Sequence, residues 1–320
     1  MLLSICIPTY NRSGFLRKTL DSIVAQGAWA EGETQIVISD NCSTDDTPAV
    51  VAEFSGRFPT LIRGVRRDPA IHAHDNFEAA LRMGEGEFLK LNNDTLSWRE
   101  GALAEYLALV RQVRREAGLI LTPNSCLAPV YGKRAVRCAD VDEVLRQCSY
   151  FLTWIGTVCF RREAFLTLPE PSRYLDTFLT QTDMILRMAS AGAPVVADGR
   201  IFFDSLPVAR KNPKSLIRIF SINFPDMVSA YVPEKISRRS FAEVKKQLFR
   251  QFIIPAAFDY FREEPEMERP GYWGSTVRYH RQWYFYSGFF RIAALFLLGR
   301  CFKRETLRRI KRALTGGGAR

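Results

Sequence analysis

The first 122 residues alternate between short apolar runs and segments whose apolar residues recur at helical spacing. The apolar runs predict buried strands, at residues 2–7, 35–39, 61–65, 88–91 and 118–122. The periodic segments between them predict helices, at residues 15–25, 45–58, 76–83 and 103–115. Because this order of strand and helix is typical of parallel strands with helical crossovers, the predicted fold class is α/β, with a mostly parallel central sheet flanked by helices.

Polar clusters follow three of the predicted strands directly, at residues 8–12, 40–46 and 92–95. In a parallel sheet the carboxyl ends of neighbouring strands meet at one edge, and ligands bind in the crevice outside that edge. The three clusters therefore predict a ligand site at the carboxyl edge of the sheet.

The first two clusters suit a nucleotide. After the first strand, a turn that opens a helix presents backbone N–H groups to an anion, with Tyr10 placed to stack on a base and Arg12 to reach a phosphate. After the second strand, Asp40 is placed to accept a hydrogen bond from a base imide or a ribose hydroxyl. Both clusters are also typical of a turn before a capped helix, with Ser43 or Thr44 as the cap of the second one.

The third cluster, Asn92-Asn93-Asp94, suits one divalent cation. Mg²⁺ and Mn²⁺ take oxygen ligands, and such ions keep several waters and need few protein groups. An ion held there would neutralise the diphosphate of a leaving nucleotide. Asn and Asp also dominate turns, so this cluster alone does not separate a metal site from a turn.

Together the clusters resemble the family 2 glycosyltransferases, which are inverting enzymes of the Rossmann-like GT-A fold. The resemblance covers residues 1–205 and runs, in the family's order, through SICIPTYNR, IVISDNCSTDDT, DNFEAALRMGEGEFLKLNNDT, IGTVCFRREAF and QTDMILRMASAG. It implies metal-assisted transfer of a sugar from a nucleotide-diphosphate donor to a glycan or lipid-linked acceptor, in the synthesis of bacterial cell-surface polysaccharide. The donor would be a UDP-, dTDP-, GDP- or CDP-sugar.

The resemblance also implies roles for individual residues. Asp94 is the last acid of the D-x-D motif and is expected to bind Mn²⁺ or Mg²⁺, whereas Asn92 replaces the first acid, which puts a direct role of position 92 in metal binding in question. The residues expected to bind the donor are Pro8, Thr9, Tyr10, Arg12, Asp40, Asn41, Asn76, Asn92 and Asn93. The residues expected at the acceptor are Trp154, Gly156 and Thr182.

Asp183 is the expected catalytic base. An inverting transfer is a single displacement at the anomeric carbon, so a base must lie on the face opposite to the leaving diphosphate. Asp183 is also placed to cap a helix predicted at 184–191, and Trp154 is as typical of a protein core as of a sugar-stacking surface.

The basic residues are concentrated towards the end of the chain. Residues 205–320 contain 23 Lys and Arg but only 9 Asp and Glu, whereas the preceding residues contain 22 and 25. We therefore expect a helical, basic region at 206–320 after a GT-A catalytic domain at 1–205. That domain is expected to have a nucleotide-binding half, 1–95, and an acceptor half, 96–205.

Aromatic, apolar and basic residues follow one another within 284–315. This combination is typical of a helix on an anionic membrane surface, and equally of a helix packed on the catalytic domain or on another subunit of a homo-oligomer. The seven cysteines include no C-x-x-C pair, which indicates free thiols in a reducing compartment. With no secretory leader and no long uncharged apolar stretch, the expected location is cytoplasmic, peripheral on the inner face of the plasma membrane.

Three other function classes are disfavoured. A sugar nucleotidyltransferase would have a Gly-rich, basic N-terminal loop, which residues 8–14 do not form. A basic nucleic-acid-binding protein would carry a recognised motif, whereas here the charge is confined to the end of the chain, and we expect no nucleic acid partner. A dehydrogenase would show G-x-G-x-x-G after the first strand.

Overall fold

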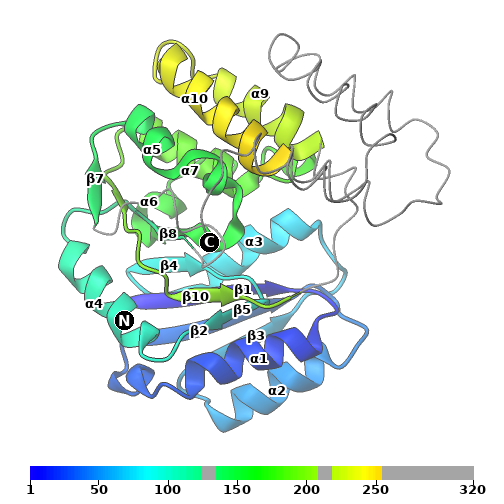
Figure 1. Ribbon diagram of the computed structural model, residues 1–320. Helices are drawn as coiled ribbons and strands as arrows, with labels where there is room; N and C mark the ends of the chain where they lie inside the picture. Colours follow the sequence, from blue (N-terminus) through cyan, green and yellow to red (C-terminus); the bar gives the residue numbers. More distant parts are fainter. Residues whose placement is uncertain (124–134, 208–217, 254–320) are drawn as a thin grey trace, which may run out of the picture. The chain divides into compact units, whose positions relative to one another are not determined.

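The computed structural model describes residues 1–123, 135–207 and 218–253. The chain separates into two compact units, Met1–Val208 and Ala209–Arg320. The first unit has a central sheet with helices on both faces (Figure 1). Its mostly parallel sheet confirms the predicted α/β class.

Eight strands in the described part of the chain form the central sheet, and four of them, β1 to β4, are mutually parallel. β8 runs antiparallel to β4 and β6, and β7 runs antiparallel to β9. The five strands predicted in the first 122 residues occur within two residues of their predicted bounds. In spatial order the strands are β3 (Ile62–Arg66), β2 (Thr34–Asp40), β1 (Leu3–Thr9), β4 (Phe88–Leu91), β8 (Val158–Arg161), β6 (Leu119–Leu121), β9 (Val195–Ala197) and β7 (Val136–Cys138).

Helices cover both faces of this sheet (Figure 1). One face packs on α1 (Ser13–Val24), α2 (Thr47–Arg57) and α4 (Ala102–Val113). The other face carries α3 (Ala73–Met83), α5 (Val141–Cys148), α6 (Arg162–Leu166) and α7 (Thr180–Ser190). β1 and β2 are buried along their whole length, which explains why their sequences are continuous apolar runs rather than alternating ones.

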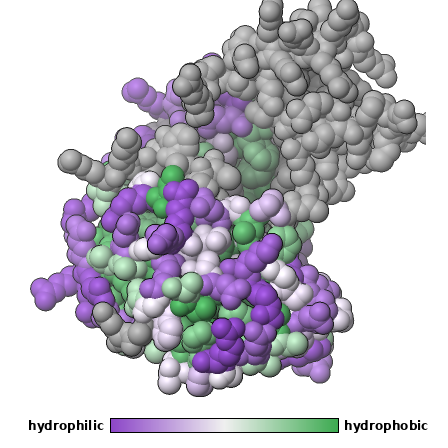
Figure 2. Space-filling view, turned by 60° about the horizontal axis from the view of Figure 1, so that its bottom comes forward, coloured by the Kyte–Doolittle hydropathy of each residue, from purple (hydrophilic) through white to green (hydrophobic). Residues whose placement is uncertain are grey.

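The outer side of α1 and α2 is charged. Arg17 on α1 forms a two-bond ion pair with Glu53 on α2, and Arg57 pairs with the same carboxylate. Figure 2 looks towards this side and shows hydrophilic residues interspersed with hydrophobic ones. The two helices are therefore amphipathic, with their apolar faces towards the sheet.

A small antiparallel ribbon lies outside the predicted pattern. It joins β5 (Leu96–Trp98) to β10 (Phe203–Ser205). The rings of Trp98 and Phe203 meet edge to face, with their centroids 4.6 Å apart. The ribbon therefore ties the segment after the third polar cluster to the end of the first unit.

The described part of the second unit is helical. It contains α9 (Phe224–Ser229) and α10 (Arg238–Leu248), with π-helical turns at Ile219–Asn223 and Phe249–Ile253. Within the described ranges, no helix combines the length and the apolar character that spanning a bilayer requires. The predicted surface segment 284–315 lies outside the described residues.

Candidate active site

The carboxyl ends of β1, β2 and β4 bring the polar clusters to one edge of the sheet. Thr9 Oγ1 donates a hydrogen bond to Asp94 Oδ2 at 2.9 Å, and Arg12 Nη1 lies 3.5 Å from Asp94 Oδ1. Thr9 is also the register partner of Asp40 on β2. Pro8 is buried beside them at the end of β1, while Tyr10 is 53% exposed.

Asp40 has a buried carboxylate oxygen without a partner. The side chain is 1% exposed, and Oδ1 accepts a hydrogen bond from the Ser43 N–H at 3.1 Å. Oδ2 is buried and accepts no hydrogen bond in the described chain. Leaving a buried polar atom without a partner costs free energy, so a donor group that reaches this oxygen would be stabilising.

The first two polar clusters bind each other. The Asn11 N–H donates to Ser43 Oγ at 2.9 Å, and Asn11 Oδ1 accepts from the Thr44 N–H at 2.7 Å. The residue at the N-cap position of α2 is Asp46, so the capping predicted for Ser43 or Thr44 is wrong. α2 begins at Thr47, whose N–H is accepted by Asp45 Oδ1 at 2.9 Å.

Asp45 also holds the start of α1, because its Oδ2 accepts the Ser13 N–H at 3.0 Å. Burial alone would raise the pKa of this carboxyl group, but the hydrogen bonds from Thr47 and Ser13 outweigh it and lower the pKa to about 2. The ionised carboxylate therefore fixes two helix N-termini beside the site, where negative charge is favourable.

The amides of Asn41 and Asn76 are used inside the protein. Asn41 Nδ2 donates to the Ile71 carbonyl at 2.8 Å, and its Oδ1 accepts the Ile71 N–H at 2.9 Å. Asn76 Oδ1 accepts from Ser39 Oγ at 2.6 Å, and its Nδ2 donates to the Ser39 carbonyl at 2.9 Å. Both residues were predicted to bind the sugar donor. In this arrangement Asn41 holds the loop at Ile71, and Asn76 holds the end of β2 that carries Asp40.

Asn92 is fully buried and points into the fold. Its Oδ1 accepts from Trp98 Nε1 at 3.2 Å, and its Nδ2 donates to the Asn93 carbonyl at 2.8 Å. Asn93 is half-buried beside it. Of the three residues in the cluster, it is therefore Asp94 whose side chain lies beside Thr9 and Arg12 at the edge of the sheet. No group of three His, Cys, Asp or Glu side chains suited to a metal ion occurs among the residues that the structure describes.

The predicted acceptor residues lie at the same edge of the sheet. Because β8 is antiparallel to β4, the turn Ile155–Thr157 that precedes it lies beside the end of β4. A Cβ atom on Gly156 would lie 2.6 Å from the Trp154 ring, so Trp154 packs closely over this turn. Thr182 Oγ1 donates to the Leu152 carbonyl at 3.0 Å, which holds the first turn of α7 against the same segment.

Asp183 is buried and paired with two arginines. Its side chain is 1% exposed, and Arg173 donates to both carboxylate oxygens, at 3.0 and 2.7 Å. Arg187 Nη1 adds a contact of 3.3 Å to Oδ2. α7 begins at Thr180, so Asp183 lies inside its first turn, and the alternative prediction of a helix cap is wrong. Arg173 and Arg187 together contact both carboxylate oxygens of Asp183.

Lys90 is a residue of this region that the sequence patterns did not single out. It lies within the apolar run Phe88–Leu91 and is fully buried. Burial lowers the pKa of Lys90 to about 7. The available signal was a lysine inside a predicted buried strand, directly before the third polar cluster.

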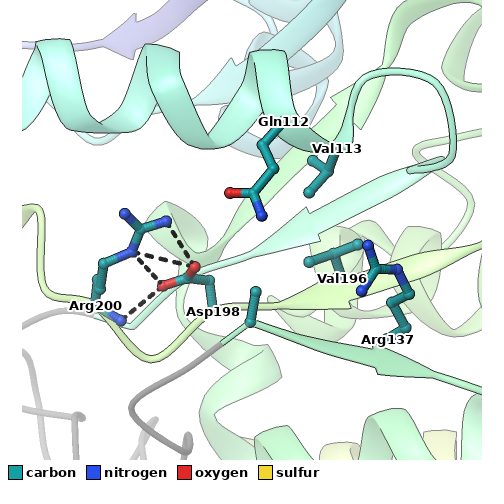
Figure 3. A pocket seen from close by; sticks show the side chains of 7 residues that line it. Gln112, Val113, Arg137, Val196, Asp198 and Arg200 are labelled. Atoms are coloured by element: carbon teal, nitrogen blue, oxygen red, sulfur yellow. Dashed lines mark hydrogen bonds and ion pairs between the residues drawn. The ribbon is translucent and has the colours of Figure 1, made fainter.

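A separate cavity of about 370 Å³ opens beside α4 and β9 (Figure 3). Within it, Arg200 forms a two-bond ion pair with Asp198, and Nη2 lies 2.9 Å from Oδ2. Its lining residues are Gln112, Val113, Ala135, Arg137, Val196, Asp198 and Arg200. None of the predicted site residues is among them.

Part of the chain matches a known family. Residues 4–113 match the model described as Glycosyl transferase family 2. Uncharacterized protein Rv1520 of Mycobacterium tuberculosis is 34% identical over 98 residues, which are 31% of this chain and 28% of that protein. Abequosyltransferase RfbV of Salmonella typhimurium is 36% identical over 90 residues, 28% of this chain and 26% of that protein. The matched stretch thus spans less than a third of these relatives' own length.

Two solved structures share the fold over most of the chain. The mannosyltransferase PcManGT from Pyrobaculum calidifontis, in complex with GDP-Man and Mn²⁺, has a TM-score of 0.58 at 14% identity and covers 98% of this chain and 85% of its own. S. aureus TarS 1-349 in complex with UDP-GlcNAc has a TM-score of 0.56 at 15% identity, covering 87% and 79%. The expected GT-A fold is confirmed.

Proposed function

Residues 4–113 of this chain belong to glycosyl transferase family 2, and on that premise we propose that the protein transfers a sugar, with inversion, from a nucleotide-diphosphate sugar to a glycan or lipid-linked glycan. The observation that carries the proposal is the meeting of Asp94 with Thr9 and Arg12, beside the unpartnered oxygen of Asp40. The abequosyltransferase among the relatives supports sugar transfer as the reaction. Neighbours bound to UDP-GlcNAc and GDP-Man support a nucleotide sugar as the donor.

The donor is bound by side chains at the carboxyl edge of the sheet. Asp40 Oδ2 accepts a hydrogen bond from the base imide or a ribose hydroxyl, which satisfies its buried oxygen. Arg12, whose side chain is 35% exposed, turns from Asp94 towards the diphosphate. Tyr10 is exposed and stacks on the base.

One divalent cation, Mn²⁺ or Mg²⁺, fits this edge through Asp94. Such ions accept one or two protein carboxylates and complete their shell with phosphate oxygens and water, so a single acid suffices. A bound ion would supply charge neutralisation of the leaving diphosphate. The long Arg12 contact, 3.5 Å, is weak enough for the carboxylate to exchange partners.

Asp183 serves as the base on the acceptor side. The acceptor hydroxyl oxygen attacks the anomeric carbon from the face opposite to the diphosphate, and its proton passes to the carboxylate. The bond from the anomeric carbon to the diphosphate oxygen breaks, and the nucleoside diphosphate leaves. Trp154, Gly156 and Thr182 line the acceptor's approach. We place the acceptor in bacterial cell-surface polysaccharide synthesis at an anionic membrane surface, which the basic residues after 205 favour.

A thermal-shift screen tests the proposal. UDP-GlcNAc, GDP-mannose, a dTDP-sugar and a CDP-sugar are each added with and without Mn²⁺. A ligand at 100 times its Kd stabilises the native state by about 2.7 kcal/mol, so one donor should raise Tm in an Mn²⁺-dependent way. Asp94→Ala should abolish that dependence, while Asp21→Ala on the exposed side of α1 should keep it. A flat response to every donor, or a full response in Asp94→Ala, would reject the proposal.

A further inference from the structure

Lys90 is a fully buried lysine at the junction of the proposed donor and acceptor sides of the site. Its side chain has no exposed surface, and it forms no ion pair with any residue that the structure describes. Its titratable neighbours are the thiols of Cys6 and Cys159, whose pKa values burial raises, so both stay protonated. Lysine is among the residue types least often fully buried, and its contacts must explain its presence here.

The Lys90 ammonium group bonds two main-chain carbonyls where the sheet opens. Nζ donates to the carbonyl of Leu91, at 3.1 Å, and to that of Gly156. The β4–β8 ladder ends at the pair of Lys90 with Cys159, so both carbonyls lie beyond the last paired residues. The side chain therefore links the two strands at the point where their backbone pairing stops.

The two linked segments carry different parts of the proposed site. Leu91 directly precedes Asn92–Asp94, on the donor side. Gly156 belongs to the turn Ile155–Thr157, which together with the preceding Trp154 is called the acceptor-side turn 154–157. The same ammonium group lies 4.8 Å from the ring centroid of Phe203.

Phe203 also contacts the acceptor-side turn, because its ring centroid lies 6.4 Å from that of Trp154. In addition, a Cβ on Gly156 would lie 2.7 Å from Leu96 Cδ1, so the Leu96 side chain packs closely against the turn. A shift of the Lys90 side chain would therefore displace both the backbone of this turn and the side chain of Trp154.

We propose that Lys90 is a positioning residue of the sugar transfer, which holds the turn 154–157 at a fixed spacing from Asn92–Asp94. This inference rests on the proposed function, because sugar transfer requires the donor and the acceptor to be held at a fixed distance from each other. The alternative is a role in stability alone. Lys90→Met keeps a side chain of similar length and removes the donor to two carbonyls. Because removing a buried amine also removes its desolvation cost, the loss of the two hydrogen bonds is partly offset, so Lys90→Met separates the two roles.

Hydrogen exchange on the full chain tests the link without a substrate. In Lys90→Met we expect amides 91–94 and 154–157 to exchange about tenfold faster, with Tm within about 2 °C of wild type, because their carbonyls lose a common donor. Leu89→Met, one residue away on the opposite face of the strand, is the control and should change neither segment. Uniformly faster exchange with a lower Tm, or unchanged exchange in both segments, overturns the inference.

Kinetics then test positioning. Release of nucleoside diphosphate is measured with Mn²⁺ and each of the four donors of the thermal-shift screen, with water as the acceptor of the sugar. Lys90→Met should lower kcat about tenfold or more with the donor KM within about twofold, because misplacement of reacting groups lowers the rate more than donor binding. Lys90→Gln, whose amide still donates, should restore part of the rate.

The two failures are distinguishable. An unchanged kcat in Lys90→Met, or a change confined to KM, contradicts positioning by Lys90. If instead the wild-type protein releases nucleotide from no donor, the proposed function fails, and the exchange experiment still decides whether Lys90 links the two segments.

Discussion

Asp183→Asn separates the catalytic and structural roles of the buried carboxylate. The side chain is 1% exposed and accepts hydrogen bonds from Arg173 and Arg187. Asparagine keeps the shape but has one acceptor oxygen and no charge. If Asp183 is the base, kcat should fall at least about 100-fold, the lower end of what general base catalysis contributes, while donor affinity stays within about twofold.

The stability cost follows from the same contacts. Charge-assisted hydrogen bonds contribute roughly 1.5–3 kcal/mol each, and the substitution loses the equivalent of one or two. The Arg173 share is discounted for solvent screening, because that side chain is 37% exposed, whereas Arg187 is 13% exposed. We therefore expect a loss of about 2–3 kcal/mol, which lowers Tm by about 4–12 °C for a unit of this size.

Arg173→Gln is the matched control, since it weakens the same ion pairs and leaves the carboxylate in place. It should lose about 1 kcal/mol of stability, and its kcat should fall by less than tenfold. The assay is nucleotide release with the donor that gives the largest thermal shift, together with thermal melting. A kcat within tenfold of wild type in Asp183→Asn would remove Asp183 as the base. An unchanged Tm would refute the estimate from the ion pairs.

Two further predictions concern the turn before α2 and the end of the chain. Asp45→Ala should lower the free energy of unfolding by about 1 kcal/mol at pH 7, as the loss of a helix cap does. Folding lowers the pKa of Asp45 from 3.8 to about 2. In urea unfolding, the difference in free energy from wild type should therefore be full above about pH 4 and shrink as the pH falls towards 2. A constant difference across that range would contradict this assignment. Deleting 284–320 should abolish co-sedimentation with anionic vesicles, at about 1 kcal/mol per basic residue near the surface, and unchanged recovery would reject the surface segment.

Periodicity was sufficient for the first half of the fold and weak for the second. Up to residue 122, apolar runs alternate regularly with helical periods, so local spacing determines all the elements there except the three-residue strand β5. β8 and β9 are as short as β4 and β6, but no such alternation surrounds them in the sequence. The antiparallel direction of β8, which places Trp154 and Gly156 at the site, depends on tertiary packing alone.

The sequence predicted the positions of the site residues, but not the contacts of their side chains. Positions after strands predicted where Thr9, Asp40 and Asp94 would meet, because the carboxyl ends of parallel strands share an edge. The sequence does not reveal how a side chain is already engaged. Asn76 and Asn92 look like ligands for a nucleotide or a metal, yet both amides are taken up by neighbouring parts of the fold.

The pairing of β4 with β8 determines which segments of this protein can be exchanged with those of its relatives. The family match ends with α4, so residues 4–113 supply β1 to β5 and leave the outer edge of β4 bare. Such a fragment would present an open edge prone to pairing with other chains. A chimera that exchanges everything after α4 would keep the residues proposed to bind the nucleotide sugar. We expect it to fold if the incoming strand reproduces the three register pairs along β4 and offers a carbonyl to Lys90.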